Sequence, residues 1–353
     1  MALLSVTVRH FRNLATGEVP LSSAVTLLVG QNAQGKTNFL EALLLLLAGI
    51  SLRGQSDRDL VAWGQDGYRL HGPWMGEGVN PVEKERVVTV NPLRRRESGP
   101  RIPAVAFSPD DLMLVKGSPE LRRRFLDEVA GQIRPRYLPE LRRYQRAVSQ
   151  RNRALKGDAA QTVLDSFDPL LAEAGSYVWS VREEVVASLQ ARVPDVLGAL
   201  APIDHMVIAL ERGGHAVTST KAAFLAELER RRQEERIRGA TLTGPHRDDL
   251  CIIVNGRSAD LFASQGQQRS LALALKLASR DILEEVSGRQ PVVLLDDVFS
   301  ELDGVRRQAL LRLMSRSRQQ TVVTDTDRED IGEMADLRYA VEAGVLRPVQ
   351  TGG

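Results

Sequence analysis

Near its amino-terminal end the sequence reads Gly30-Gln-Asn-Ala-Gln-Gly-Lys-Thr37, which fits the pattern G-x-x-x-x-G-K-[ST] without deviation. The preceding run, Val25-Thr-Leu-Leu-Val29, is apolar and typical of a buried strand. The following run, residues 38–47, is rich in leucine and typical of a helix. A strand, a glycine-containing loop and a helix in this order form a P-loop. The sequence therefore predicts an α/β fold that binds a nucleotide.

The residue types of this loop predict distinct roles. Gly30 and Gly35 allow the backbone to turn so that successive N–H groups face the phosphates. Lys36 is predicted to reach the β- and γ-phosphates, and Thr37 to supply a hydroxyl to Mg²⁺. The predicted nucleotide-binding residues of the loop are Gly30, Gln31, Asn32, Ala33, Gln34, Gly35, Lys36 and Thr37.

A second block of chemistry lies towards the other end of the chain. The apolar run Val292–Leu295 ends in two carboxylates, Asp296 and Asp297. We expect Asp296 to hold Mg²⁺, and Asp297 to be the base or the group that orients the attacking water. Taken alone, the two acids could also form an ordinary turn at the end of a strand.

The segment Ser264-Gln-Gly-Gln267 opens a predicted helix upstream of these acids. The amide groups and the positive dipole end of such a helix suit a γ-phosphate. Taken alone, Ser264 could instead cap the helix. Because one nucleotide site needs one phosphate cradle, a second phosphate-binding segment suggests a site shared between two subunits.

The spacing of these blocks predicts the domain organisation. Lys36 and Asp296 are 260 residues apart, yet both must contact one Mg–nucleotide. We therefore predict that residues 1–115 and 240–353 together build one α/β head. Residues 116–239 are predicted to form a mainly helical insertion beside it.

Apolar residues recur at helical spacing within this insertion. The longest stripe runs from Phe167 to Leu189 and is expected to end at Pro194. It is short for a coiled-coil arm, so no long coiled coil is expected. A charged helix over residues 221–238 and a hairpin at Asn255-Gly256 are also predicted.

The charge of the chain is unevenly distributed. The net charge is only +2, but residues 116–156 carry twelve Lys or Arg against four acids. Clustered arginine on helices is typical of a surface that binds a phosphate backbone, although a solvated helix face has the same pattern. The predicted DNA contacts in this segment are Arg122, Arg123, Arg142, Arg143 and Arg151.

Composition limits the class of protein. The chain has 353 residues, of which 43% are apolar and 26% charged, as in ordinary globular proteins. The single cysteine, Cys251, excludes an intramolecular disulfide and a cysteine-rich metal site, which favours a reducing cytoplasm. The first eight residues read as a strand and not as a secretory signal. The apolar run Leu43–Leu47 is far shorter than the ~20 residues of a membrane span.

The order of these blocks resembles the ABC-type ATPase head: a P-loop, a Ser-x-Gly-Gln loop, a strand with two acids, then Ser300-Glu-Leu-Asp303. More closely, the chain resembles the RecF family of that class, and the resemblance covers nearly the whole sequence, to about Asp327. The additional matching stretches are Phe11-Arg-Asn13, Phe107–Leu112, Gly117-Ser-Pro119, Arg122–Asp127, Gln150-Arg-Asn152 and Thr243-Gly-Pro-His-Arg-Asp-Asp-Leu250.

The resemblance implies a head similar to those of the chromosome-maintenance ATPases, without their coiled coils. It implies a cytoplasmic protein that binds ATP, forms an ATP-dependent homodimer, binds single-stranded and gapped duplex DNA and hydrolyses ATP slowly. Its implied partners are RecR, with RecO and RecA in the pathway, in DNA replication, recombinational repair and the SOS response.

The resemblance also implies roles for individual residues. Ser264, Gly266 and Gln267 would contact the γ-phosphate bound by the partner subunit's Lys36. Asp303 would lie across the same interface. By matching position, Arg12 and Asn13 would join the nucleotide site.

The chain departs from the wider ABC pattern at two places. Asp297 stands where that class has a catalytic glutamate, and its side chain is one methylene shorter, so we predict slow hydrolysis. Thr324-Asp-Thr-Asp327 stands where transporter heads carry a histidine, so no γ-phosphate sensor is assigned. Gln55, Gln65 and the loop from Phe107 to Asp110 are candidates for the lid that closes over the nucleotide.

Other functions remain open at this point. The chain could be a structural DNA clamp like the chromosome-maintenance ATPases. A transporter ATPase subunit would need a surface for a membrane partner and a switch histidine, and the basic helical segment does not suit it. A small-molecule P-loop kinase would not need the segment from Ser264 to Gln267.

Overall fold

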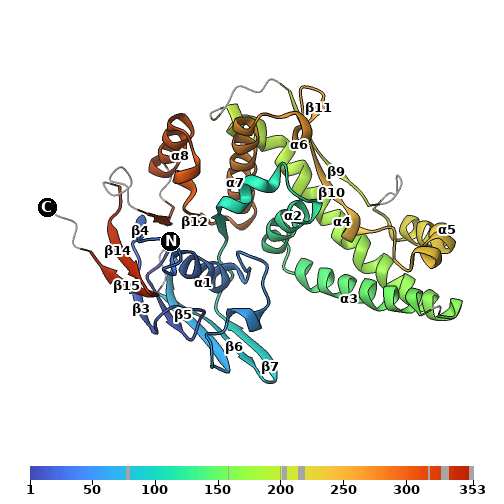
Figure 1. The fold of residues 1–353 in the computed structure, drawn as a ribbon, viewed down its shortest axis with the longest axis horizontal. Coiled ribbons are helices and arrows are strands. Elements are labelled where there is room, and N and C mark those ends of the chain that lie inside the picture. Colours follow the sequence, from blue (N-terminus) through green and yellow to red (C-terminus); the bar gives the residue numbers. More distant parts are fainter. Residues whose placement is uncertain are drawn as a thin grey trace. The chain divides into compact units, whose positions relative to one another are not determined.

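A computed structural model describes residues 1–349 except 77–79, 158, 199, 201–204, 214–218, 317–318 and 327–333. The chain forms two compact units, the first of residues 1–112 and 276–353 and the second of residues 113–275 (Figure 1). Asp327, the last residue of the predicted match, lies outside the described residues.

The boundary of the second unit differs from the predicted one. Residues 240–275 lie in the second unit, whereas their strand-like sequence had suggested the head. The reason is that β10 (Asp249–Val254) pairs antiparallel with β9 (Met206–Glu211), a strand of the helical segment. The tertiary structure determines which strand pairs with which, and the sequence pattern of a single strand does not identify its partner.

The first unit contains a mainly parallel sheet with the strand order β15-β14-β4-β13-β12-β8. Only β15 runs antiparallel to its neighbour. Parallel strands bring their carboxyl ends to one edge, where ligands bind in open α/β sheets. The strands are β4 (Val25–Val29), β8 (Ala104–Phe107), β12 (Val292–Asp296), β13 (Thr321–Asp325), β14 (Leu337–Glu342) and β15 (Val345–Pro348).

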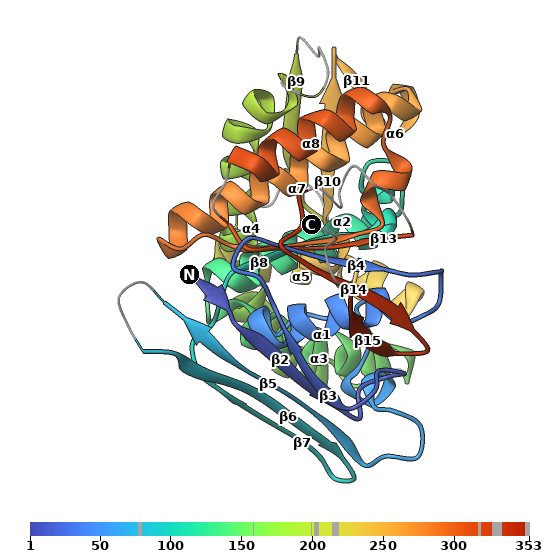
Figure 2. The same cartoon turned by 90° about the vertical axis from the view of Figure 1, so that its left-hand side faces the viewer.

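A second, antiparallel sheet has the order β3-β2-β5-β6-β7, with β1 paired to β5. Helix α1 (Lys36–Ala48) lies between the two sheets (Figure 2). Its leucine-rich sequence is buried at most positions, as expected of a helix that is apolar all round. The strands are β1 (Ala2–Leu3), β2 (Ser5–Arg9), β3 (Gly17–Pro20), β5 (Gly67–Met75), β6 (Val82–Val90) and β7 (Leu93–Ser98).

Short helices complete the first unit: η1 (Asp57–Leu60), η4 (Val298–Glu301) and α8 (Gly304–Arg316). Two further helices, η2 (Pro109–Leu114) and α7 (Gln265–Ser287), cross from one unit into the other. The α/β P-loop head predicted from the sequence is confirmed by this arrangement of strands around α1.

The second unit is mainly helical and carries a three-stranded antiparallel sheet, β11-β10-β9. Its core includes Trp179 and Phe224, whose ring centroids are 4.6 Å apart. The remaining elements are α2 (Pro119–Ile133), α3 (Tyr137–Lys156), α4 (Gln161–Gly198), α5 (Lys221–Arg238), η3 (Pro245–Arg247), β11 (Arg257–Ser258) and α6 (Ala259–Phe262).

Helix α4 is longer than its apolar stripe predicts, because it continues through Pro194 to Gly198. The expected end at Pro194 is therefore wrong. Proline lacks an N–H and removes one backbone hydrogen bond from the helix. Val193 and Leu197, on either side of Pro194, are buried, and their packing compensates for this loss. The helix packs against α2, α3, α5 and β9 within its own unit.

Two local predictions are confirmed in the second unit. The charged helix α5 has the predicted bounds. In the β10–β11 hairpin, Asn255 and Gly256 have φ angles of 49° and 76°. Among the helices that the structure describes, none is both long and apolar enough to cross a membrane.

Candidate functional site

The P-loop joins the end of β4 to the start of α1. Gly35 precedes the helix with a φ of 113°, a conformation that favours glycine. A Cβ at Gly30 would lie only 2.4 Å from the carbonyl oxygen of Val341 in β14. The loop is therefore shaped both by its own glycines and by close contact with the neighbouring strand.

The Lys36 side chain folds back over this loop. Its Nζ donates hydrogen bonds to the carbonyl oxygens of Gly30 and Gln31, the latter at 3.0 Å. Burial lowers the pKa of Lys36, and neighbouring carboxylates oppose that shift. An ammonium held by loop carbonyls can exchange them for phosphate oxygens, as the predicted role requires.

The two predicted metal ligands lie together. Thr37 Oγ1 donates a hydrogen bond to Asp296 Oδ1 at 2.9 Å, across 259 residues of sequence. Asp296 is buried, and burial raises its pKa, although hydrogen bonds from Thr37 and Thr324 oppose this. A buried carboxylate with a raised pKa gains stabilisation from a bound cation. The sequence could predict the residues of this pair but not their contact.

The donor set fits a Mg–nucleotide. No cluster of three or more His, Cys, Asp or Glu side chains suited to a metal occurs in the described part of the chain. Mg²⁺ in nucleotide sites is commonly held by one or two protein oxygens, with phosphates and waters completing its shell. One carboxylate and one hydroxyl from Asp296 and Thr37 match that requirement.

Thr324 is a site residue to which the sequence assigned no role. It lies opposite Asp296 in the parallel β12–β13 pairing, and its Oγ1 donates to Asp296 Oδ1 at 2.9 Å. The next residue, Asp325, is fully buried and is among the carboxylates that raise the pKa of Lys36. The sequence feature that could have identified Thr324 and Asp325 is that two apolar strands, β12 and β13, each end in polar residues.

Asp297 follows Asp296 in an unusual backbone conformation. Its φ of 49° lies in the left-handed region, which costs a non-glycine residue on the order of 1–3 kcal/mol. Its N–H donates to Thr324, at 3.0 Å to Oγ1 and 3.2 Å to the carbonyl oxygen. Among the carboxylates that raise the pKa of Lys36, Asp297 has the largest effect. The turn thus places a second carboxylate near the lysine.

The segment that contains Arg12 and Asn13 runs beside α1. Arg12 Nη2 forms an ion pair with the buried Glu41 at 2.6 Å. Asn13 Oδ1 accepts a hydrogen bond from Asn38 Nδ2 at 2.7 Å. Both predicted residues therefore flank the P-loop, and their contacts are with the first turns of its helix.

The structure distinguishes the lid candidates by their contacts. Gln55 Oε1 accepts a hydrogen bond from Arg12. Gln65 instead closes a turn, with its N–H donating to the carbonyl oxygen of Ala62 at 3.1 Å. Asp111 caps the loop after Phe107 by accepting from the Ser108 N–H at 2.7 Å. Gln55 is thus the candidate tied directly to a predicted nucleotide-site residue.

A support for the P-loop that we did not predict comes from the β14–β15 turn. Its Gly344 N–H donates to the Gln34 carbonyl oxygen at 2.8 Å, and its Ala343 N–H donates to Gln34 Oε1 at 2.7 Å. The Gly344 carbonyl oxygen accepts from Ala15 N–H at 2.9 Å. The turn therefore ties the P-loop to the segment that follows Asn13.

The segment from Ser264 to Gln267 forms a reciprocal cap on α7. Gln267 N–H donates to Ser264 Oγ at 3.2 Å, and Ser264 N–H donates to Gln267 Oε1 at 2.9 Å. Capping is thus one role of this loop. The same geometry leaves Ser264 exposed, at the positive end of a 23-residue helix.

Asp303 caps the next helix, α8. Its Oδ1 accepts from the Arg306 N–H at 3.0 Å, and its side chain also pairs with the Arg306 guanidinium. These donors hold the pKa of Asp303 below its usual value. The side chain is exposed and is therefore available to an interface.

The basic segment is only partly accessible. Arg122 is 6% exposed, and its Nε and Nη2 donate to Asp249 at 2.6 and 2.7 Å. Arg151 is fully buried, so the prediction that these two residues contact DNA is corrected. Arg142 is exposed, whereas Arg123 and Arg143 are half-buried. Charge counting along a sequence cannot separate buried from accessible arginines.

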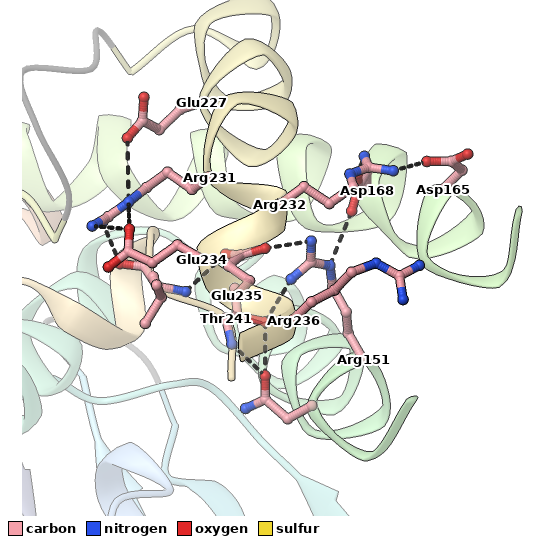
Figure 3. A network of polar contacts seen from close by, with 12 residues as sticks. Arg151, Asp165, Asp168, Glu227, Arg231, Arg232, Glu234, Glu235, Arg236 and Thr241 are labelled. Carbon is pink, nitrogen blue, oxygen red and sulfur yellow. Dashed lines mark hydrogen bonds and ion pairs between the residues drawn. The ribbon is translucent and has the colours of Figure 1, made fainter. Parts of the chain in front are cut away.

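Arg151 belongs to a polar network that joins three helices (Figure 3). Its guanidinium pairs with Asp168 of α4 at 3.0 Å and with Glu235 of α5 at 2.7 Å. It also donates to Thr241 Oγ1 at 3.0 Å, and Thr241 in turn donates to Asn152 Oδ1 at 2.8 Å. Within the Gln150-Arg-Asn152 stretch, Arg151 and Asn152 therefore have structural roles.

The Thr243–Leu250 stretch is likewise structural. Asp248 is fully buried and accepts from Arg182 Nη1 at 2.7 Å and from Trp179 Nε1 at 2.9 Å. His246 Nδ1 lies 2.6 Å from the Tyr144 hydroxyl, and burial lowers its pKa to about 4. This stretch thus joins α3 and α4 of the second unit.

Comparison with known proteins places the chain in a family. The AAA ATPase domain family matches residues 1–65. The chain is 37% identical to the DNA replication and repair protein RecF of Halalkalibacterium halodurans, over 98% of this chain and 99% of that protein. It is 38% identical to RecF of Anaeromyxobacter dehalogenans, over 99% and 100%.

Solved structures agree with these sequence matches. Two structures of the recombination mediator protein RecF in the RecFOR pathway, one of RecF-ATPrS and one of RecF-ATP, match at 29% identity with TM-scores of 0.89 and 0.87. Each match covers 99% of this chain, and they cover 98% and 97% of the respective RecF chains. An Smc head domain from Pyrococcus furiosus shares the fold, with a TM-score of 0.53 at 16% identity over 98% and 95%. The chain therefore belongs to the RecF family of DNA replication and repair proteins, with an ATPase head of the ABC type.

Proposed function

We propose that this protein is an ATP-gated DNA clamp of recombinational repair, in which slow hydrolysis sets how long a dimer stays on DNA. The observation that carries the proposal is the 2.9 Å contact between Thr37 and Asp296, which joins the two ends of the sequence at the P-loop. Membership of the RecF family and its similarity to a RecF-ATP structure support ATP as the nucleotide.

In the proposed site, the loop 30–35 binds the phosphates through its amide groups. Lys36 exchanges its loop carbonyls for the β- and γ-phosphate oxygens, and Thr37 with Asp296 would hold Mg²⁺. The bound ion supplies charge neutralisation at the phosphates. Thr324 fixes Asp296 through its hydroxyl, so that the carboxylate keeps one orientation.

Asp297 is the proposed base that accepts a proton from the attacking water. Its left-handed backbone follows directly on Asp296, and of the neighbouring carboxylates it has the largest effect on the pKa of Lys36. A carboxylate one methylene shorter than glutamate is placed less well for a water in line with the γ-phosphate, so we infer slow turnover. Asp297→Asn should retain ATP binding but prolong the ATP dimer, as measured by its dissociation after dilution. If the variant dimer dissociates as fast as the wild type, Asp297 is not the base.

We also propose that Ser264, Gly266 and Gln267 act in the neighbouring subunit of a homodimer. The exposed Ser264 at the positive end of α7 supports this role, because such an end attracts a γ-phosphate. Ser264→Arg should bind ATP normally but remain monomeric in equilibrium sedimentation. Ser166→Arg, at an exposed serine of α4 in the same unit, is the matched control. A normal ATP dimer in the Ser264 variant would remove this role.

DNA contact is proposed for the accessible arginines of the basic segment, Arg123, Arg142 and Arg143. Arg142→Ala combined with Arg143→Ala should weaken binding to gapped duplex and reduce the slope of log affinity against log salt by up to about 2. Arg94→Ala with Arg347→Ala, two exposed arginines of the first unit, is the control. An unchanged salt slope would show that these arginines form only a solvated face.

Family membership supports a proposal for the pathway partners. The solved relatives are described as recombination mediators of the RecFOR pathway. We propose that the ATP dimer binds gapped or single-stranded DNA and acts with RecR and RecO to help load RecA. DNA is expected to stimulate its weak ATPase activity.

One experiment separates this function from its competitors. Sedimentation with and without Mg·ATP, followed by binding to a gapped duplex, should show an ATP-dependent dimer that binds DNA. A chain that stays monomeric with ATP, or that ignores DNA at moderate salt, would exclude the clamp.

A further inference from the structure

Trp63 is an aromatic side chain without a structural role in the fold. It is 100% exposed, whereas the other two tryptophans, Trp74 and Trp179, are 3% and 0% exposed. Burying an indole is among the largest apolar gains a chain can make, so full exposure forgoes that gain. A protein that keeps the ring in water retains a flat surface for a ligand.

The turn that carries Trp63 is well defined. Gln65 N–H donates to the Ala62 carbonyl oxygen at 3.1 Å, which closes a four-residue turn with Trp63 and Gly64 at its centre. Gly64 has a φ of 76°, as the third position of a type II turn requires. The ring therefore projects from a defined backbone turn, so ordering the backbone on binding would cost little entropy.

This turn is attached to the segment that flanks the P-loop. Ala62 N–H donates to the His10 carbonyl oxygen at 2.8 Å, and Arg12 N–H donates to the Leu60 carbonyl oxygen at 2.9 Å. Phe11 and Val61 form the bridge between these two bonds. The exposed indole thus follows directly on a backbone ladder with residues 10–12.

The other side of the same segment contacts the phosphate-binding helix. Arg12 pairs with Glu41 at 2.6 Å, and Asn13 accepts from Asn38 at 2.7 Å. One short stretch, residues 10–13, therefore links the P-loop helix to the Trp63 turn within the first unit. A nucleotide has its phosphates at one end and its base at the other, and this stretch joins a phosphate-binding element to an aromatic surface.

We propose that Trp63 is the stacking platform for the base of the nucleotide whose phosphates the P-loop binds. This inference rests on the proposed ATP binding. Stacking of a base on an aromatic ring contributes about 1–3 kcal/mol. Because the interaction uses the face of the ring, Trp63 would favour a large purine without reading its hydrogen-bonding edge.

Tryptophan fluorescence tests this proposal, because the emission quenched by acrylamide belongs to the exposed Trp63. Mg·ATP should quench that emission and reduce its accessibility to acrylamide. Mg·tripolyphosphate, which has the phosphates but no base, should bind without either effect. Trp63→Ala should weaken ATP binding by about 5-fold to 150-fold, and leave tripolyphosphate binding unchanged. Trp63→Phe should restore most of the ATP affinity.

Calorimetry on the same samples separates failure of the inference from failure of the proposed function. Normal ATP binding with unchanged Trp63 emission, or with unchanged affinity in Trp63→Ala, would overturn the stacking role alone. Quenching of the Trp63 emission by single-stranded oligothymidylate but not by ATP would also overturn the stacking role, and would show instead that the indole contacts DNA. Absence of ATP binding, with wild type equal to Lys36→Ala, would overturn both.

Discussion

The contact of Gly344 with the P-loop segment predicts a large effect from a single methyl group. Gly344 has a φ of 80° in the two-residue β14–β15 turn, where Ala343 also has a positive φ of 46°. A Cβ at this position would lie 1.9 Å from the carbonyl oxygen of Asn13. For Gly344→Ala that separation must grow to at least 3.0 Å, so the turn and the segment of Asn13 must move apart.

The size of the effect follows from two contributions. The left-handed conformation costs alanine about 1–2 kcal/mol. Separation of the backbones weakens the hydrogen bonds that Gly344 makes with Gln34 at 2.8 Å and with Ala15 at 2.9 Å, each contributing about 1 kcal/mol. We therefore expect Gly344→Ala to lower the free energy of unfolding by about 3–4 kcal/mol. Displacement of the loop should also weaken ATP binding at least tenfold, which is about 1.4 kcal/mol.

Gly288→Ala is the matched control for this substitution. Gly288 belongs to the same unit and also has a positive φ, of 63°, but a Cβ at its position would meet nothing within 4 Å among the described residues. It should show the conformational cost alone, with ATP affinity unchanged. Urea denaturation and calorimetric ATP titration of both variants measure the two effects. Equal unfolding free energies and equal ATP affinities in the two variants would refute the claim that the turn supports the P-loop.

Three further predictions concern buried ionisable side chains. Asp296→Asn should raise the unfolding temperature of the nucleotide-free protein at pH 8, because the raised pKa of Asp296 means that its ionised form destabilises the folded state. This gain should disappear below pH 3.8, where the carboxyl is protonated in both the folded and the unfolded chain. Thermal melts that still show the gain below pH 3.8 would contradict the reasoning. The pKa of His246 is lowered to about 4 in the folded protein, so as the pH falls the imidazole of the unfolded chain is protonated before that of the folded chain. The free energy of unfolding should therefore fall as the pH drops from 6.5 to 4, and His246→Gln should flatten that pH dependence in urea titrations. Arg151→Met should destabilise the protein by about 3–5 kcal/mol, because the buried Glu235 loses this ion-pair partner, although Asp168 keeps its pair with Arg232. Arg153→Met, at an exposed position, should change the stability little, and equal chemical stability of the two variants would show that the network contributes nothing.

The P-loop head could be predicted from sequence because its signals are local. Gly35 adopts a backbone conformation that favours glycine, and the leucine-rich run after it is a helix buried between two sheets. Asn255-Gly256 likewise forms the predicted hairpin turn. In each case the backbone conformation depends on residues that are adjacent in sequence.

The candidate site could be predicted only in part. Spacing and residue type identified Thr37 and Asp296, which the structure places 2.9 Å apart. Thr324 was not assigned, because its role comes from the parallel pairing of β13 with β12. The β14–β15 turn was missed for a related reason, since its contact with Gln34 joins residues 309 or more positions apart.

The sequence by itself determined the candidate residues for binding phosphate and metal, because each such role requires a particular side chain at a particular turn. Only the tertiary structure decided which charges are available for binding. Arg122 and Arg151 resemble Arg142 in sequence, yet the first two are buried in ion pairs with acids 127 and 84 residues away. The physical reason is that an ion-pair partner determines whether a charged side chain is buried or accessible, and partners distant in sequence meet only when the chain folds.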